Sequence, residues 1–229
     1  MFKRTNHRAI ASILESLDAQ LLYDYRCYFG GGTSIVLQRN EYRESVDIDF
    51  LVSDLDGYRE LRQRVMGAGG INALTTRPVQ VQRDIRADQY GIRTVVGAGG
   101  SPVKFEIIHE GRIALDYPSA GDTVCGVSTL SELDAAASKL LANADRWADR
   151  SVHYRDIIDL AMLAPASSVL DAAIQKASRA YGDSITRCLS SVIDHLAEDP
   201  SRLSDAIEKL QLSVPYAEMW PRIEALRTA

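Results

Sequence analysis

Two carboxylates, Asp47 and Asp49, are separated by a single residue within an apolar run. Side chains alternate along a strand, so we expect Val46, Ile48 and Phe50 to face a core. Both carboxylates then project from the opposite face, with Cα atoms about 6.6 Å apart. Like charges at this spacing repel unless a cation lies between them. Mg²⁺, or Mn²⁺ in its place, prefers hard oxygen ligands of this kind together with substrate phosphates. The pair therefore predicts a divalent metal site.

A run of three glycines precedes this pair, because residues 30–34 read Gly-Gly-Gly-Thr-Ser. Glycine reaches backbone conformations that other residues avoid, and it lets a ligand approach the main chain. Several N–H groups of such a turn are therefore able to face one anion. The apolar residues 35–37 predict a short helix whose positive end faces the same anion. The residues expected to bind nucleotide phosphates are Gly31, Gly32, Thr33 and Ser34.

Each of these features has an ordinary explanation when taken alone. A Gly-Gly turn is usually only a turn, and an Asp-x-Asp pair at a strand end is usually a solvated edge. Here the turn comes first, one short helix follows, and Arg39 and Arg43 lie between the helix and the acidic pair. This order favours a nucleotide site, in which we expect the turn and the acidic pair to meet across one groove.

The same order of motifs resembles the nucleotidyltransferase superfamily, and more closely its AbiEii/AbiGii-type toxins from type IV toxin–antitoxin systems. These toxins typically read Gly-Gly-Thr, followed by Arg-x-Ser-x-Asp-Ile-Asp. Residues 31–33 and 43–49 match both motifs. The resemblance implies a Mg²⁺-dependent nucleotidyltransferase that uses a nucleoside triphosphate (NTP), with Arg43 and Ser45 supporting the bound nucleotide.

A third carboxylate is implied by the superfamily resemblance, on a strand beside the Asp-x-Asp strand. The run 103–108 alternates apolar and charged residues, which places Lys104 and Glu106 opposite the core. Opposed residues on paired strands lie about 5 Å apart. We therefore expect Glu106 to share the metal with Asp47 and Asp49. The alternative is an ordinary exposed strand glutamate.

Two further motifs complete the resemblance. These toxins carry a lysine in a helix of the type Leu-x-Ala-x-Lys-Leu, and then Arg/Lys-Asp-x-x-Asp-Leu; residues 133–140 and 155–160 fit these patterns. The resemblance implies that Lys139 binds the triphosphate, since an ammonium is a common partner of phosphate. Asp156 either orients Lys139 or assists deprotonation of the attacking hydroxyl, and a role for Asp159 stays open. The alternative is a set of surface ion pairs, typically worth under ~1 kcal/mol each.

The family resemblance also implies a biological role. Some members transfer nucleotides to the 3′ end of tRNA and so block translation, and a cognate antitoxin accompanies the toxin. The alternatives are a nucleotidyltransferase that modifies a small molecule or a protein side chain, and an inactive module that binds nucleotide or antitoxin. Intact Asp47 and Asp49 argue against the inactive module, since a retired site has no reason to keep two repelling carboxylates.

The composition is that of an ordinary globular protein, with 46% hydrophobic and 25% charged residues and a net charge of −5. Residues 1–8 lack the apolar core of a signal peptide, and no apolar run approaches the ~20 residues that span a bilayer. We therefore expect a cytoplasmic protein. Cys27, Cys125 and Cys188 are odd in number and far apart, which favours reduced thiols.

Basic residues gather in the middle of the chain, although the net charge is negative. They are Arg77, Arg83, Arg86, Arg93 and Lys104. Such a local basic face is able to hold a triphosphate or an RNA backbone. For any one residue the simpler interpretation is a solvated sheet face.

Hydrophobic periodicity predicts an α+β fold, with strands and helices in the N-terminal part and helices beyond residue 127. The resemblance implies that the N-terminal part is a nucleotidyltransferase-like mixed β-sheet flanked by helices, followed by a C-terminal helical bundle. Residues 1–127 form the predicted catalytic domain, and residues 128–229 form a helical domain that contributes Lys139 and Asp156. Within the first domain we expect a helix over 7–21, a strand over 25–29, a helix over 55–68, and a hairpin with its loop at 97–102.

Overall fold

The computed structural model describes residues 2–98 and 101–227, which group into two units. The first unit contains the described residues up to 41 together with those from 45 to 131. The second contains residues 42–44 and those from 132 onward. The predicted mixed sheet and helical C-terminal region are confirmed. Residues 42–44, which we had assigned to the first domain, group with the helical unit, and the boundary at 127 stays a prediction.

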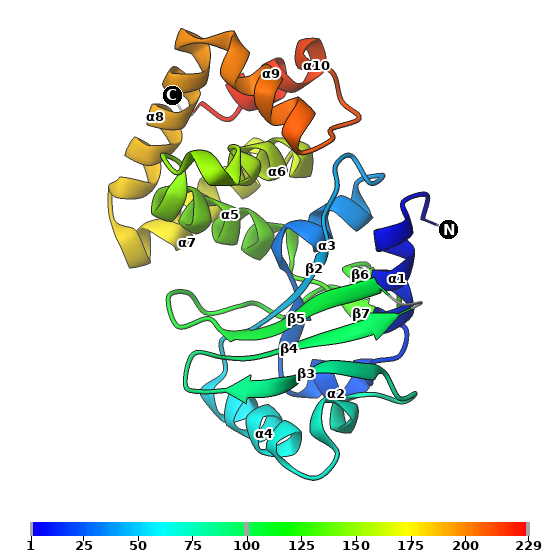
Figure 1. Ribbon diagram of the computed structural model, residues 1–229. Helices are drawn as coiled ribbons and strands as arrows, with labels where there is room; N and C mark the ends of the chain where they lie inside the picture. The colour runs from blue at the N-terminus through cyan, green and yellow to red at the C-terminus, as the bar shows by residue number, and fades with distance from the viewer. Residues whose placement is uncertain (1, 99–100, 228–229) are drawn as a thin grey trace. The chain divides into compact units, whose positions relative to one another are not determined.

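The first unit is built on a mixed sheet (Figure 1). Within the described residues this sheet has five strands in the order β1-β2-β5-β4-β3. They are β1 (Cys27–Phe29), β2 (Asp47–Val52), β3 (Gln80–Ala87), β4 (Gly91–Ala98) and β5 (Ser101–His109). The central strands β2 and β5 are parallel, and the other pairs are antiparallel. A short ribbon of β6 (Thr123–Val124) and β7 (Val127–Ser128) accompanies the sheet.

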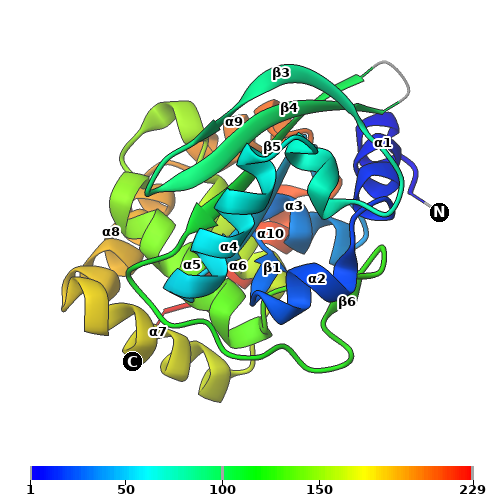
Figure 2. The same ribbon diagram turned by 90° about the horizontal axis from the view of Figure 1, so that it is seen from below.

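One face of the sheet is the core of this unit. Ile48 pairs with Phe105 and Phe50 with Ile107 in the β2–β5 register, and all four side chains are buried. Helices α1 (Thr5–Leu14) and α4 (Leu55–Met66) pack their apolar stripes on this face, and Figure 2 shows α4 lying along the sheet. Burial of one such side chain contributes about 1.5–3 kcal/mol. Because side chains alternate along a strand, the polar residues of β2 and β5 lie on the opposite face.

The helix predicted over residues 7–21 is two helices. α1 ends at Leu14, and α2 (Ala19–Asp24) begins after Asp18, whose carboxylate accepts the N–H of Leu21 at 3.0 Å. The apolar spacing continues across this break, so periodicity alone did not reveal it. Asp18 is the helix N-cap that divides the two, because a short side-chain acceptor favours a new helix start.

Strand boundaries also differ from the prediction. β2 begins at Asp47, and Val46, which we expected in the core, is 44% exposed. β1 begins at Cys27 rather than at residue 25, because Arg26 adopts a left-handed conformation with φ 54°. The predicted β4–β5 hairpin is present, with Ala98 paired to Ser101. Gly99 and Gly100 of its loop lie outside the described residues.

The second unit is helical. Its helices are α5 (Glu132–Arg146), α6 (Arg155–Leu163), α7 (Ser167–Tyr181), α8 (Ser184–Glu198), α9 (Pro200–Lys209) and α10 (Tyr216–Glu224). α5 packs against α6, α7 and α8, and α6 packs against α10. The segment 42–44 is held here by main-chain bonds: Glu44 donates to the Leu210 carbonyl at 3.2 Å, and Ser213 donates to that of Tyr42 at 2.8 Å.

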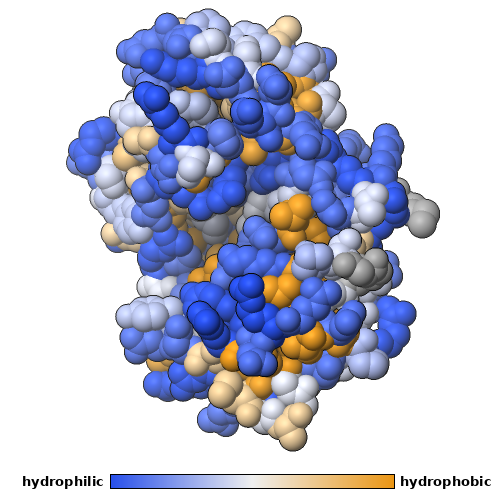
Figure 3. All heavy atoms as spheres, viewed as in Figure 1, coloured by the Kyte–Doolittle hydropathy of each residue, from blue (hydrophilic) through white to orange (hydrophobic). Residues whose placement is uncertain are grey.

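Hydrophilic residues predominate on the face drawn in Figure 3, with smaller apolar patches between them. Among the residues that the structure describes, none of the helices has the length and apolar character needed to cross a membrane.

Candidate active site

The glycine turn lies against the acidic strand. α3 (Gly31–Gln38) starts earlier than predicted, with Gly30 as its N-cap and Gly31 at φ +66°. The Gly30 N–H donates to the Asp49 carbonyl at 2.8 Å. A Cβ on Gly31 would lie 2.6 Å from Asp49 Oδ2. The turn thus lies against Asp49, and glycine at residue 31 is what permits this approach. A groove shared with both carboxylates stays a prediction.

The carboxylates occupy the sheet face opposite the core. In the parallel β2–β5 register, Asp49 is directly opposite Glu106 and Asp47 is opposite Lys104. Residues opposed in neighbouring strands share a face, about 4.8 Å apart. Asp47 and Asp49 are half-buried, whereas Glu106 is buried. The register therefore places Asp47, Asp49 and Glu106 on one face of the sheet, and their shared role at a metal stays a prediction.

Two cations compensate Glu106. Arg93 Nε lies 3.0 Å from Glu106 Oε1, and Lys104 pairs with the other carboxylate oxygen. Burial lowers the pKa of the Lys104 ammonium, but Glu106, Asp47 and Asp49 outweigh burial and raise it above its ordinary value. The carboxylates of β2 and β5 thus favour the charged form of Lys104.

The donor set of this face suits a hard divalent cation. Asp47, Asp49 and Glu106 offer only carboxylate oxygens, which Mg²⁺ and Mn²⁺ accept. In the described part of the chain, no three His, Cys, Asp or Glu side chains gather closely enough to hold a metal ion. Both carboxylate oxygens of Glu106 are instead paired with cations, Arg93 on β4 and Lys104 on β5.

Hydroxyl groups lie at the first turn of α3. Thr33 is buried, and its Oγ1 shares a hydrogen bond of 2.7 Å with Ser45 Oγ. Ser34 is also buried, and its Oγ accepts from Gln38 Nε2 at 3.1 Å within the same helix. Of the predicted nucleotide-binding residues, Thr33 and Ser45 thus form a pair, whereas Ser34 contacts its own helix.

The second unit holds a separate cluster of charges around Asp159, whose side chain is fully buried. Arg43 Nε and Nη2 donate to its two oxygens at 2.7 and 2.8 Å, and Tyr42 Oη donates at 2.6 Å. Lys139 Nζ lies 2.6 Å from Asp159 Oδ2. Burial raises the pKa of Asp159, but Arg43 and Lys139 outweigh it and hold the pKa below its ordinary value. Asp159 is therefore an anion at neutral pH.

Asp156 extends the cluster from the same helix. Lys139 Nζ donates to Asp156 Oδ1 at 3.0 Å, and Arg146 Nε donates to Oδ2 at 2.7 Å. Burial raises the pKa of Asp156, yet Lys139 and Arg146 hold it far below its usual range. Lys139 thus bridges two buried carboxylates, so the alternative of weak surface ion pairs does not describe these three residues.

A family model described as the nucleotidyl transferase AbiEii toxin of type IV toxin–antitoxin systems matches residues 12–229. This chain belongs to the AbiEii family. The predicted family and enzyme class are thereby confirmed: the protein is a nucleotidyltransferase of a toxin family. A search of the curated proteins finds no match.

Solved structures are similar to this AbiEii-family chain, and the two from Helicobacter pylori share its fold. A Helicobacter pylori protein described as a candidate nucleotidyltransferase is 15% identical, with a TM-score of 0.52, 97% of this chain covered and 92% of that chain. JHP933 from the same organism is 16% identical, with a TM-score of 0.52 and coverage of 99% and 92%. MenT4, a nucleotidyltransferase toxin from Mycobacterium tuberculosis H37Rv, is 17% identical, with a TM-score of 0.43 and coverage of 98% and 96%.

Sequence reasoning missed several polar residues of this AbiEii-family chain. Tyr42 adjoins the motif arginine. Arg146 lies seven residues after Lys139, two turns along the same helix, and this spacing is a signal that could have identified it. The pairing of His7 with Glu41 had no signal at all, because 34 residues separate them. Arg43 had been predicted to bind nucleotide, but Asp159 and the Glu44 carbonyl occupy its guanidinium.

Proposed function

We propose that this AbiEii-family enzyme transfers a nucleoside monophosphate from an NTP to a 3′-terminal hydroxyl of tRNA, in a reaction that depends on Mg²⁺ or Mn²⁺. One observation carries the proposal: the N-terminus of α3 opens on Gly31, whose Cα lies beside the Asp49 carboxylate, with Glu106 opposite on the next strand. A phosphate cradle beside paired carboxylates is the arrangement that metal-assisted phosphoryl chemistry uses.

In this proposal the α3 turn holds the β- and γ-phosphates. Backbone N–H groups of Gly31, Gly32 and Thr33 belong to the first turn of the helix, which leaves N–H groups without intrahelical acceptors. Ser45 supports the turn through its hydrogen bond with Thr33. A divalent ion held by Asp47 and Asp49, with Glu106 beside them, would neutralise charge that develops on the phosphates.

We assign the helical unit a supporting role. Lys139 carries the positive charge proposed for the triphosphate, and Asp156 and Asp159 fix the direction of its ammonium. Arg43 acts indirectly in this proposal, by compensating Asp159 so that Lys139 is not the sole partner of that carboxylate. Asp156 also remains the proposed aid to deprotonation of the attacking hydroxyl.

Basic residues favour a polyanionic acceptor such as tRNA. The strand register continues from Asp49 through Glu106 and Arg93 to Arg86 on the edge strand β3. Arg83 lies on the same strand and is exposed. A row of cations that leads away from the carboxylates on one sheet face is suited to a phosphate backbone whose end reaches the metal site.

The family supports an antitoxin as the partner of this chain, and the proposed role is that of a toxin that blocks translation. NTPs and tRNA are found together in the cytoplasm, so the proposed reaction implies that location.

The experiment is a transfer assay. Purified protein is incubated with each α-labelled NTP, Mg²⁺ and total tRNA, and the control is tRNA whose 3′ end has been oxidised with periodate. We expect label on intact tRNA, none on oxidised tRNA, and none after chelation of the metal. Label on protein or on a small molecule would refute the acceptor, and the absence of transfer to any acceptor would refute the enzymatic role.

A pair of variants tests the carboxylates in the same assay. Asp49→Asn should reduce transfer by at least about 100-fold, the scale of removing a principal electrostatic contact. The matched control is Asp56→Asn, on the exposed surface of α4, which should transfer as the wild type does. Circular dichroism checks that both variants are folded.

A further inference from the structure

The side chain of His7 is fully buried, and both of its ring nitrogens have hydrogen-bond partners. Nδ1 lies 2.8 Å from Glu41 Oε1, and Nε2 lies 3.3 Å from the main-chain N of Ser45. The three residues come from α1, from the turn after α3, and from the segment that leads into β2. His7 therefore joins the N-terminal helix to the chain on both sides of residues 42–44.

The partners determine how the imidazole is used. A main-chain N–H is only a donor, so Nε2 must accept from Ser45. An ionised carboxylate is only an acceptor, so Nδ1 must carry the proton that is donated to Glu41. Burial raises the pKa of Glu41, but the main-chain N–H groups of Lys3 and Arg4, followed by His7, outweigh it and hold the pKa below its ordinary value. Glu41 is thus ionised at neutral pH and orients the ring.

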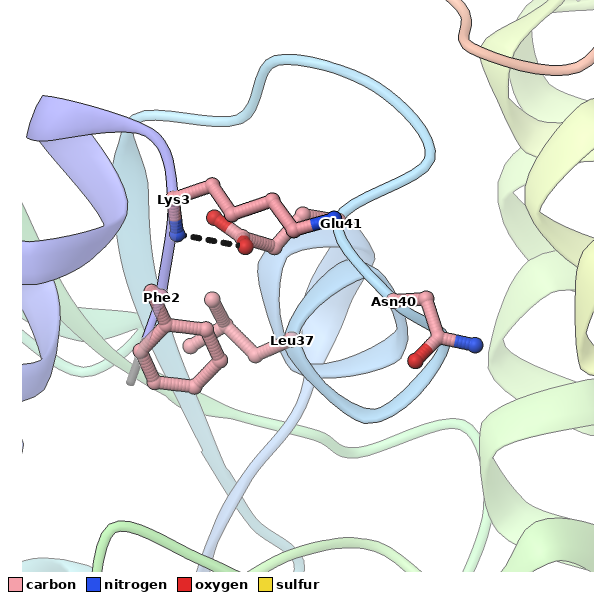
Figure 4. A pocket seen from close by; sticks show the side chains of 5 residues that line it. All are labelled: Phe2, Lys3, Leu37, Asn40 and Glu41. Atoms are coloured by element: carbon pink, nitrogen blue, oxygen red, sulfur yellow. Dashed lines mark hydrogen bonds between the residues drawn. The ribbon is translucent and has the colours of Figure 1, made fainter.

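The turn that carries Glu41 is held in a demanding conformation. Asn40 and Glu41 both have positive φ, at 59° and 55°, a region that asparagine tolerates and that is unfavourable for glutamate. Figure 4 shows the carboxylate of Glu41 turned toward the main-chain N of Lys3, at 2.7 Å. Phe2 and Leu37 lie below this contact and line a pocket of about 240 Å³. The contacts of one carboxylate compensate for the strained turn.

The link continues into the proposed phosphate cradle. Ser45, whose N–H is held by His7, shares its hydroxyl with Thr33 on the first turn of α3. Glu41, His7, Ser45 and Thr33 thus form one series of hydrogen bonds that ends at the glycine turn. His7 precedes residue 12, where the family match begins. The family motifs therefore contain Thr33 and Ser45 but not the residue that orients them.

We propose that His7 is a positioning residue for nucleotide binding: oriented by Glu41, it holds Ser45 and thereby keeps Thr33 in the geometry that receives the triphosphate. This inference rests on the proposed function, in which Thr33 binds phosphate. His7 touches no reacting atom, so its loss acts on the affinity for the NTP rather than on the chemical step.

The main test compares variants of His7 in the transfer assay. We expect His7→Ala to raise KM for the NTP about tenfold with little change in kcat, the scale of one lost buried hydrogen bond. His7→Gln should recover most of the affinity, since its amide oxygen is able to accept from the Ser45 N–H. A fall in kcat at unchanged KM would overturn the assignment.

A control separates positioning from stability. Ile13→Val shortens a buried side chain of the same helix without touching a polar partner, so it should lower the Tm and leave KM unchanged. A double-mutant cycle tests whether His7 acts through Ser45. Its second substitution is Ser45→Ala, which removes the hydroxyl bound to Thr33. If His7 acts through Ser45, adding His7→Ala to Ser45→Ala should not raise KM further. Additive effects would overturn the proposed series.

A measurement made without nucleotide distinguishes an error in the role of His7 from an error in the proposed function. Amide hydrogen exchange should show the Ser45 N–H protected in the wild type and exposed in His7→Ala. If the wild type binds NTP and His7→Ala loses this protection without losing affinity, the inference is wrong and the proposed function stands. If the wild type binds no NTP at all, the proposed function is wrong, and the role of His7 in it falls as well.

Discussion

Asp159 is enclosed by hydrogen-bond donors. Its two oxygens receive Arg43 on one side, Lys139 on the other, and the hydroxyl of Tyr42. Burial of a charge is costly unless partners satisfy it, and here the partners are themselves charged and buried. The members of the cluster therefore depend on one another: without Asp159, Arg43 loses its carboxylate partner and Lys139 keeps only Asp156.

Asp159→Asn tests this dependence. The amide removes a negative charge from between Arg43 and Lys139, and we expect the free energy of unfolding to fall by about 3–5 kcal/mol. The matched control is Glu198→Gln, which breaks an exposed pair with Arg202 of 3.6 Å and should cost under ~1 kcal/mol. Urea denaturation followed by circular dichroism measures both. Equal losses in the two variants would show that burial does not strengthen the cluster.

Acid should unfold the protein through the same carboxylates. The pKa values of Asp156 and Asp159 lie below the ordinary 3.8 in the folded state. Their contribution to stability is therefore complete above the unfolded pKa of about 3.9, and it is lost as the pH falls toward the folded values. We expect the free energy of unfolding to drop steeply below about pH 4. Asp156→Asn should flatten that drop, whereas exposed Asp205→Asn should leave it as in the wild type.

The sheet face that a side chain occupies could be predicted from the sequence where the residue lies in an alternating strand. Asp47 and Asp49 alternate with apolar neighbours, and their shared face follows from that alternation alone. Glu106 was found because its strand also alternates. His7 could not be found in this way, since its partners become neighbours only after α1 packs on the sheet.

At the scale of elements, the turn from β1 into α3 controls the site. Gly30 and Gly31 both lie where a larger residue would clash: a Cβ on Gly30 would come within 2.5 Å of Leu51 and 2.9 Å of Leu130. The turn is therefore tight enough for its N–H groups to reach the acidic strand, and its exact start is fixed by packing that periodicity does not describe.

Gly31→Ala tests this turn. An alanine at residue 31 would need the unfavourable positive φ of 66°, and its Cβ would lie 2.6 Å from Asp49 Oδ2. The clash should displace the carboxylate and reduce kcat/KM at least about tenfold. The positive φ should lower the free energy of unfolding by about 1–2 kcal/mol. Gly126→Ala is the control, because φ is 83° there and nothing lies within 4 Å of an added Cβ. That variant should lose stability and keep its activity. Similar activity of the two would show that the contact with Asp49 is unimportant.

Element types followed from the sequence, whereas their ends often did not. The helix over 55–68 is confirmed with slightly shorter bounds, since α4 ends at Met66. The division between α1 and α2 was missed because their apolar positions remain in phase across Asp18. The position of β1 was misjudged because the left-handed Arg26 leaves no mark in composition.

At the scale of the whole molecule, the net charge of −5 hides a local arrangement of opposite signs. Carboxylates gather on β2 and β5, and arginines lie on β4 and on the edge strand β3. A pair of charge reversals tests this arrangement. Arg86→Glu should raise KM for tRNA about tenfold at low salt, and the effect should shrink as salt increases.

The control for that prediction is Arg59→Glu, which makes the same charge change on the exposed surface of α4, the helix that covers the other face of the sheet. It should leave KM for tRNA unchanged. If both variants raise KM equally, net charge rather than the row on the sheet governs acceptor binding.

The two-part organisation was predictable from the change of period near residue 128, because strands alternate and helices do not. The assignment of residues 42–44 was not, since a segment of three residues carries no periodicity. Only the partners of Tyr42 and Arg43 reveal where it belongs.

That segment has a consequence for biosynthesis. Arg43 leaves the ribosome 116 residues before Asp159, a delay of roughly 6–23 s at about 5–20 residues per second. Throughout this interval a nascent chain lacks the Asp159 carboxylate that binds the guanidinium, and the segment after α3 stays open to proteases. Brief trypsin treatment of stalled chains should cut after Arg43 until residue 159 has emerged and spare the bond in longer ones, so the ordering of this stretch waits for the synthesis of α6.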